Sequence, residues 1–147
     1  MKPDARAHRA LAGQPAGSIH LFVNGTLMSG EELHENLAGA RFCGEWTTAP
    51  RYRLFSVDDR HPAMVRDDMR GAAIAGELYE VPLPVLGTVL DREPAGLGLG
   101  VVELADGQLT LGVVWLPPEL PPSSRDISEY GDWRRYRAAA TGTKVST

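Results

Sequence analysis

The hydrophobic and polar positions of the chain first form a clear pattern in a short apolar run. Between Ile19 and Val23 every residue except one histidine is apolar, which is typical of a buried strand. Asn24 and Gly25 then predict a turn. Runs of the same strand character follow at residues 42–46, 51–57, 72–81, 101–104 and 109–116, with a loop expected at residues 58–62.

After the first turn, apolar residues recur at the spacing of a helix. Ser29 stands before Gly30 and two glutamates, and Leu33 and Leu37 lie four positions apart. A serine cap and acidic residues beside the positive end of the helix dipole both stabilise a helix start. We therefore expect a short helix from Ser29 to about Gly39.

Prolines and glycines divide the second half of the chain. Pro82 and Pro84 bracket the start of a second helix, since proline is tolerated in a first turn. Residues 91–100 contain one proline and three glycines, and we expect a loop there. The Asp106-Gly107 pair predicts a hairpin between the last two strands.

The C-terminal segment, residues 125–136, is expected to return to the core as a terminal helical turn. Asp126 or Ser128 is the candidate cap. Trp133 and Tyr136 lie three positions apart, so they share one face and would pack against the sheet.

Strands outnumber helices, and the strand–helix alternation of a parallel doubly wound sheet is absent. The fold class is therefore α+β. Irregular strand spacing favours a small mixed β-barrel with short flanking helices. A length of 147 residues fits one domain. We expect this domain at residues 18–137, between a disordered leader at 1–17 and a disordered tail at 138–147.

The composition restricts the classes of molecule that the protein is expected to bind. The formal charge is −4 with no long run of one sign, which argues against a nucleic-acid surface. The single cysteine, Cys43, excludes an intrachain disulfide and a cysteine metal site, and no cofactor is expected. No apolar stretch approaches the roughly 18 residues that span a bilayer. We expect a cytoplasmic protein that binds small molecules or proteins.

The turn at residues 24–27 is the first candidate site. Successive backbone N–H groups in a glycine-containing turn can form a concave nest for a carboxylate or phosphate. The alternative is an ordinary connection between a strand and a helix.

Several segments resemble one superfamily. The string from Leu21 to Met28, LFVNGTLM, resembles the F-V-Y-G-T-L motif of the gamma-glutamylcyclotransferase-like superfamily, and residues 37–42, 48–54 and 75–82 resemble its later core segments. Residues 100–107 and the DISEYGDWRRY string at 126–136 resemble the C-terminal domain of allophanate hydrolase more narrowly.

The resemblance implies a site as well as a fold. In cyclotransferases of this superfamily the backbone amides of the matching turn, here Asn24, Gly25, Thr26 and Leu27, bind the substrate carboxylate. Asn24 stands where these enzymes usually have tyrosine, which counts against a γ-glutamyl substrate. Their general acid/base glutamate lies in an L-D-x-x-E-G string, which makes Glu93 the catalytic candidate here.

The match at Glu93 is inexact. The string Leu90-Asp91-Arg92-Glu93-Pro94 is one residue shorter than the superfamily's, and a proline replaces the glycine. The alternative is a solvated loop glutamate, or one paired with Arg92. The catalytic role requires a partly desolvated carboxyl, whose pKa then rises toward neutrality.

Two further residues are candidates for the substrate pocket. His61 would line its mouth, because the resemblance places this loop there. Arg51 and Arg53 share one strand face, and Arg51 would pair with an anionic ligand if that face is the barrel interior. The alternative for both arginines is a solvated surface.

Three functions follow as hypotheses. The first is a relative of the allophanate hydrolase C-terminal domain that binds a small carboxylate or carbamate and decarboxylates an N-carboxycarbamate-type intermediate supplied by a separate amidase in nitrogen metabolism. The second is a gamma-glutamylcyclotransferase that forms 5-oxoproline. The third is a noncatalytic binding or assembly module. The residues alone leave open whether the protein is an enzyme.

Overall fold

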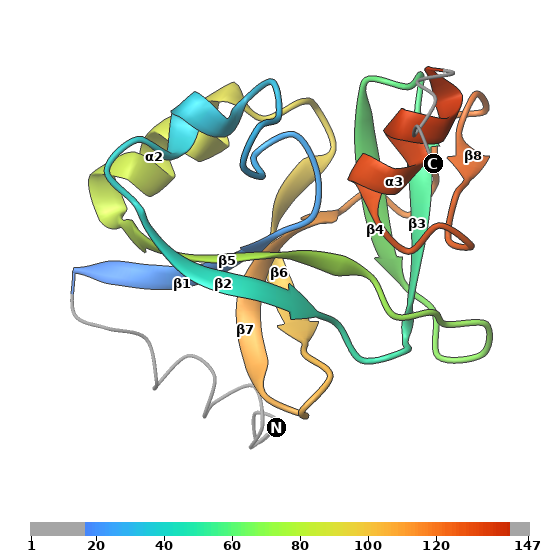
Figure 1. The fold of residues 1–147 in the computed structure, drawn as a ribbon, viewed down its shortest axis with the longest axis horizontal. Coiled ribbons are helices and arrows are strands. Elements are labelled where there is room, and N and C mark those ends of the chain that lie inside the picture. The colour runs from blue at the N-terminus through green and yellow to red at the C-terminus, as the bar shows by residue number, and fades with distance from the viewer. Residues whose placement is uncertain (1–16, 142–147) are drawn as a thin grey trace, which may run out of the picture.

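The strands form two sheets in the computed structural model, which describes residues 17–141 (Figure 1). The five-stranded sheet has the order β2-β5-β1-β7-β6, and the three-stranded sheet has the order β4-β3-β8. The strands are β1 (Ser18–Val23), β2 (Arg41–Thr47), β3 (Tyr52–Val57), β4 (His61–Arg66), β5 (Ala75–Pro82), β6 (Leu97–Glu103), β7 (Leu109–Trp115) and β8 (Arg125–Asp126). The helices are the 3-10 helix η1 (His34–Leu37), α2 (Leu83–Arg92) and α3 (Trp133–Ala140).

The first strand is the centre of the larger sheet. β1 pairs antiparallel with β5 and parallel with β7, so the sheet is mixed and the predicted α+β class is confirmed. Leu21 and Phe22 are fully buried and Val23 is nearly so. A central strand buried on both faces explains why its sequence is an apolar run rather than an alternation.

The larger sheet curls without closing along its length. Its edges are β2 and β6, which meet at one end through an antiparallel bridge between Thr48 and Leu104. Two backbone bonds hold this bridge: Ala49 N–H donates to the Glu103 carbonyl at 2.9 Å, and Ala105 N–H donates to the Thr47 carbonyl at 2.9 Å. The word barrel therefore describes this sheet only loosely.

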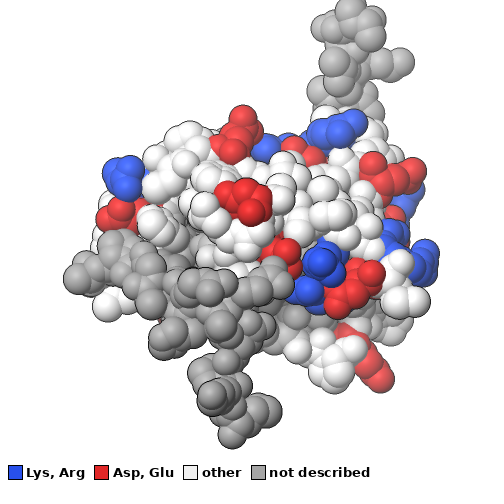
Figure 2. All heavy atoms as spheres, turned by 90° about the horizontal axis from the view of Figure 1, so that it is seen from below, with Lys and Arg blue, Asp and Glu red and all other residues white. Residues whose placement is uncertain are grey.

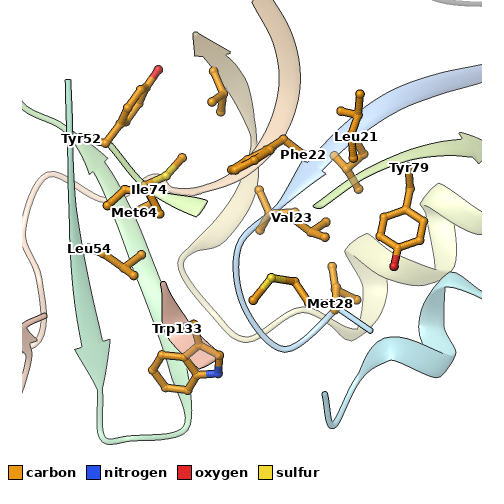
Figure 3. Close-up of a cluster of buried hydrophobic side chains, with 14 of the residues drawn as sticks. Leu21, Phe22, Val23, Met28, Tyr52, Leu54, Met64, Ile74, Tyr79 and Trp133 are labelled. Carbon is orange, nitrogen blue, oxygen red and sulfur yellow. The ribbon is translucent and has the colours of Figure 1, made fainter. Parts of the chain in front are cut away.

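The core lies between the two sheets. Tyr52, Leu54 and Met64 of the smaller sheet face Phe22 and Val23 of the larger one (Figure 3). Trp133 and Tyr136 of α3 are each 2% exposed and complete this core, with ring centroids 5.8 Å apart. They pack on one face, as their spacing predicts.

The prediction of a helix that starts at Ser29 is wrong. Residues 25–33 form turns, and only η1 is helical. Ser29 does not cap a helix, because its hydroxyl contacts the Tyr79 hydroxyl at 3.1 Å. Its N–H donates to Glu77 Oε1 at 2.7 Å. Gly30 adopts a φ of +80°. The segment ends at Gly39, with a φ of +97°, where the sequence predicts a stop.

Two predicted loops are partly strands. Residues 61–66 form β4, which pairs with β3, and β6 begins at Leu97 inside the segment expected to be a loop. The glycines of β6 leave room for side chains of and just after β7. A Cβ on Gly98 would lie 2.5 Å from Leu116 Cδ1, and one on Gly100 would lie 2.6 Å from Val114 Cγ2.

The C-terminal helix begins later than expected. Asp132 is the cap of α3, and its side chain accepts the Arg134 N–H at 2.8 Å. Asp126 lies in β8 and does not cap this helix. α3 continues to Ala140, and residues 1–16 and 142–147 of the predicted leader and tail lie outside the described residues. None of the helices within residues 17–141 is long and apolar enough to cross a membrane.

We predict opposite effects of the same substitution at two glycines. A Cβ on Gly76 of β5 would lie 2.4 Å from the Val23 carbonyl oxygen and 2.5 Å from Phe22 Cζ, whereas one on Gly87 of α2 meets no atom within 4 Å. Gly76→Ala should lower the free energy of unfolding by about 1–3 kcal/mol through overpacking. Gly87→Ala should raise it by up to about 1 kcal/mol. Urea denaturation of both variants measures this, and equal effects would contradict the packing described here.

Candidate functional site

The turn after β1 is buried and tightly held. Asn24, Gly25, Thr26 and Leu27 are all buried, and Asn24 Nδ2 donates to the Val113 carbonyl at 3.2 Å. The turn closes through the Met28 N–H, which donates to the Gly25 carbonyl at 3.0 Å. A side chain at Gly25 is excluded, because a Cβ there would lie 2.4 Å from Pro62 Cγ.

The backbone N–H groups of this turn remain available to bind a ligand. Within the described part of the chain, the backbone N–H groups of Gly25, Thr26 and Leu27 donate to no other atom. The carbonyls of the turn are occupied: Leu33 N–H donates to Thr26 O at 2.8 Å, and His34 Nδ1 lies 2.9 Å from Leu27 O. Because a carbonyl only accepts, Nδ1 of His34 carries the proton.

A buried carboxylate anchors the chain just after the turn. Glu77 is 3% exposed. It accepts the Ser29 N–H at 2.7 Å and the Tyr79 hydroxyl at 2.9 Å, and Arg134 Nη1 of α3 lies 3.4 Å from its Oε2. The sequence places Glu77 and Tyr79 on one face of a strand, but it does not show that Ser29 and Arg134 meet them.

Glu93 shares a small hollow with the turn. This inner hollow has about 260 Å³ of empty space including its open mouth and is lined by Val23, Asn24, Gly25, Thr26, Leu27, Pro62, Glu93, Leu97 and Val113. Glu93 Oε1 is buried and has no hydrogen-bond partner in the described residues. Burial raises the pKa of the Glu93 carboxyl from 4.5 to about 7.

The inner hollow therefore has an apolar lining with two kinds of polar group, hydrogen-bond donors and a titratable carboxyl. The turn offers fixed N–H groups, which can bind an anion, and Glu93 offers a carboxyl that titrates near neutral pH. Such a pair can orient a small carboxylate and transfer a proton to or from it. The sequence alone predicts both halves of this arrangement.

The two remaining candidates differ in their distance from the turn. His61 is buried and lines a second, wider hollow, the outer hollow, which has about 1020 Å³ of empty space including its open mouth. Arg51 lies outside both hollows, in a surface depression beside Glu103 and Asp68. The structure therefore brings His61 next to the turn but does not bring Arg51 to it.

Acidic and basic side chains are interspersed on the face seen in Figure 2, so this face carries no field of one sign. Within residues 17–141 no group of three histidine, cysteine, aspartate or glutamate side chains is placed to hold a metal ion.

Comparison with known proteins agrees with the narrower resemblance. A model of the allophanate hydrolase C-terminal domain family matches residues 19–138. A crystal structure of a uropathogenic E. coli-specific protein is 42% identical with a TM-score of 0.78, and the match covers 82% of this chain and 96% of that chain.

Larger proteins contain the same unit. Allophanate hydrolase of Kluyveromyces lactis is 26% identical with a TM-score of 0.77, over 84% of this chain and 21% of that chain. Urea amidolyase of Saccharomyces cerevisiae is 29% identical over an alignment of 136 positions, which covers 83% of this chain. The chain spans about 7% of the length of the curated relatives it matches.

The fold extends to the wider superfamily. A mouse AIG2-like protein has a TM-score of 0.58 at 24% identity, over 71% of this chain and 80% of that chain. The gamma-glutamylcyclotransferase-like fold expected from residues 21–28 and the later core segments is confirmed.

We predict that Glu93 makes stability depend on pH. The folded carboxyl has a pKa of about 7 against 4.5 when unfolded, so between these values the folded state binds more protons. The free energy of unfolding should therefore fall as the pH rises from about 4.5 to about 7. Glu93→Gln should flatten this part of the profile in urea denaturation. A control variant, Glu129→Gln at an exposed position, should keep the wild-type slope, and equal slopes in all three proteins would contradict the assignment.

We also predict unequal effects for two glutamates of β5. Glu77→Ala leaves the Ser29 N–H and Arg134 without their acceptor and should cost about 3 kcal/mol of unfolding free energy. Glu80 forms an exposed pair with Arg41 at 2.7 Å, and Glu80→Ala should cost less than about 1 kcal/mol. Thermal and urea unfolding compare them directly. A Glu77→Ala loss as small as that of Glu80→Ala would show that the buried carboxylate is not an anchor.

Proposed function

The chain belongs to the allophanate hydrolase C-terminal domain family, and on this premise we propose that it binds a small carboxylate or carbamate at the turn of Asn24, Gly25, Thr26 and Leu27. The observation that supports this most is the shared inner hollow, which is lined both by the turn, whose N–H groups are free within the described residues, and by Glu93.

Binding follows from the donors in the hollow. A carboxylate in the hollow would accept N–H bonds from the turn, and bonds to an ionised acceptor are roughly twice as strong as neutral ones. The apolar lining from Val23, Leu97 and Val113 lowers the local dielectric, which strengthens such bonds. A bound anion would also favour the protonated form of Glu93, so the ligand and the proton bind together.

Catalysis would use that proton. In decarboxylation of an N-carboxycarbamate, the bond between nitrogen and one carboxylate carbon breaks, and its electron pair stays on nitrogen. Carbon dioxide leaves, and Glu93 donates a proton to the nitrogen, which gives carbamate. The turn amides would hold the remaining carboxylate in place during this step. The Glu93 carboxylate then recovers its proton from water.

The proposed decarboxylation would follow an amide hydrolysis that supplies its substrate. The relatives that carry the same domain are a urea amidolyase and an allophanate hydrolase. A separate amidase acting on allophanate would release ammonia and the N-carboxycarbamate that this chain would consume. The proposed role is therefore in urea-derived nitrogen metabolism, with an amidase as the functional partner.

We predict that the protein accelerates carbon dioxide release when an amidase generates N-carboxycarbamate from allophanate. Glu93→Gln should reduce the accelerated rate roughly a hundredfold, the usual contribution of a general acid. The wild-type rate should fall above pH 7, because Glu93 then loses its proton. Glu129→Gln is the matched control and should retain the full rate. No acceleration over buffer by the wild-type protein would refute the decarboxylation.

Cyclotransfer on a γ-glutamyl-amine is the second candidate, because it requires the same pair of turn amides and glutamate. Asn24 counts against it, since its side chain is fixed to the Val113 carbonyl and supplies no aromatic wall. A panel of γ-glutamyl dipeptides assayed for 5-oxoproline distinguishes the two reactions. Ligand-dependent melting shifts without either turnover would identify a noncatalytic binding module.

A further inference from the structure

Glu93 follows directly after a cation that does not pair with it. Arg92 is the last residue of α2, and Glu93 is the next residue in the chain. An arginine side chain is long enough to reach a carboxyl beside it, and such a pair is one alternative that the sequence allows. In the described chain Glu93 Oε1 instead has no hydrogen-bond partner. The Arg92 guanidinium is therefore directed elsewhere.

Asn36 of η1 is the partner of Arg92. Arg92 Nη1 donates to Asn36 Oδ1 at 3.2 Å, and within residues 17–141 this is the only side-chain hydrogen bond of α2. The acceptor is fixed in place, because Asn36 is 6% exposed and its N–H donates to the Leu33 carbonyl at 2.9 Å. η1 and α2 lie side by side (Figure 1), so a neutral amide of one helix holds the cation of the other.

The segment that carries Asn36 is also bound to the turn. Leu33 N–H donates to the Thr26 carbonyl at 2.8 Å, and His34 Nδ1 lies 2.9 Å from the Leu27 carbonyl. η1 therefore connects the turn that offers backbone amides to the end of α2 that precedes Glu93. Asn36 supplies the polar contact on the α2 side of this connection.

Arg92 is the cation nearest in sequence to an otherwise uncharged surrounding of Glu93. The other residues that line the inner hollow carry no charge. The titratable residues of the outer hollow and of α2 are Glu32, Asp58, Arg60, His61 and Asp91. Burial is what raises the pKa of Glu93, and a guanidinium released beside the carboxyl would lower it.

We infer that Asn36 is a positioning residue, which holds the Arg92 guanidinium away from Glu93 and so leaves that carboxyl unpaired. A carboxyl paired with arginine is ionised at neutral pH and has no proton to donate. The inference rests on the proposed function for the use of that proton. The contact itself requires no ligand, so it is tested in the free protein.

The test follows the Glu93 carboxyl by ¹³C NMR titration of the full chain. Asn36→Leu removes the acceptor at similar volume, and the midpoint should fall from about 7 by about 1–3 pH units, the usual effect of an opposite charge within about 4–6 Å. Asn36→Ala also lacks the acceptor and repeats the test with a smaller side chain. Asn36→Asp retains an acceptor for Arg92 and should keep the midpoint at 7 or above.

A double variant distinguishes the charge of Arg92 from a loss of packing. Asn36→Leu with Arg92→Gln should return the midpoint to about 7, because the released cation is then absent. Asn36→Leu with Arg135→Gln removes an equal charge on α3 and should leave the midpoint low. A midpoint that stays low with Arg92→Gln would show that the substitution admits water to the hollow, and would overturn the inference. A wild-type midpoint in both Asn36→Leu and Asn36→Ala would overturn it as well.

The outcomes separate this inference from the proposed function. In the carbon dioxide assay, the loss of rate above pH 7 should move to lower pH in Asn36→Leu and return in the double variant with Arg92→Gln. If the midpoints change as expected but no carboxylate binds and no carbon dioxide is released, the role of Asn36 stands and the proposed function fails. If carboxylates bind and Asn36→Leu titrates like the wild type, only the inference about Asn36 fails.

Discussion

A single buried carboxylate, that of Glu77, holds three parts of the molecule together. It lies in β5, accepts the Ser29 N–H from the segment after the turn, and meets Arg134 of α3. A buried charge costs several kcal/mol unless it is paired and hydrogen-bonded, so each of these partners is a requirement of the fold. The larger sheet, the turn segment and the C-terminal helix are thereby fixed against one another.

The candidate site depends on this anchor. Gly30 has a φ of +80° and the Leu33 N–H donates to the Thr26 carbonyl at 2.8 Å, so the chain after β1 forms turns instead of a helix. Glu77 holds this segment in place through the Ser29 N–H. Glu93 comes to the same hollow from the end of α2, where apolar residues desolvate it. The site therefore combines backbone donors fixed by one long-range contact with a carboxyl whose pKa is set by burial.

The sequence predicts the elements whose conformation depends on residues close together in the chain. The apolar run of β1, the prolines at the start of α2 and the Asp106-Gly107 hairpin each carry their own physical reason, and the structure has all three. The helix expected from Ser29 fails because Gly30 adopts a positive φ and because Glu77 and Tyr79, which hold Ser29, are distant in sequence. The glycines of β6 predict a loop because the side chains that pack over them, Val114 and Leu116, lie elsewhere in the chain. The turn and Glu93 are predictable as separate motifs. The sequence does not predict that Arg51 lies away from them, because the pattern of one strand does not show which of its faces is interior.

The most direct test of the claim that the turn and Glu93 form one carboxylate site is a ¹³C NMR titration of the Glu93 carboxyl, with and without saturating acetate. We expect a midpoint near 7 in the free protein, set by burial, and a higher midpoint with acetate, because a bound anion beside Glu93 disfavours its ionised form. A midpoint near 4.5 that acetate does not move would contradict the account.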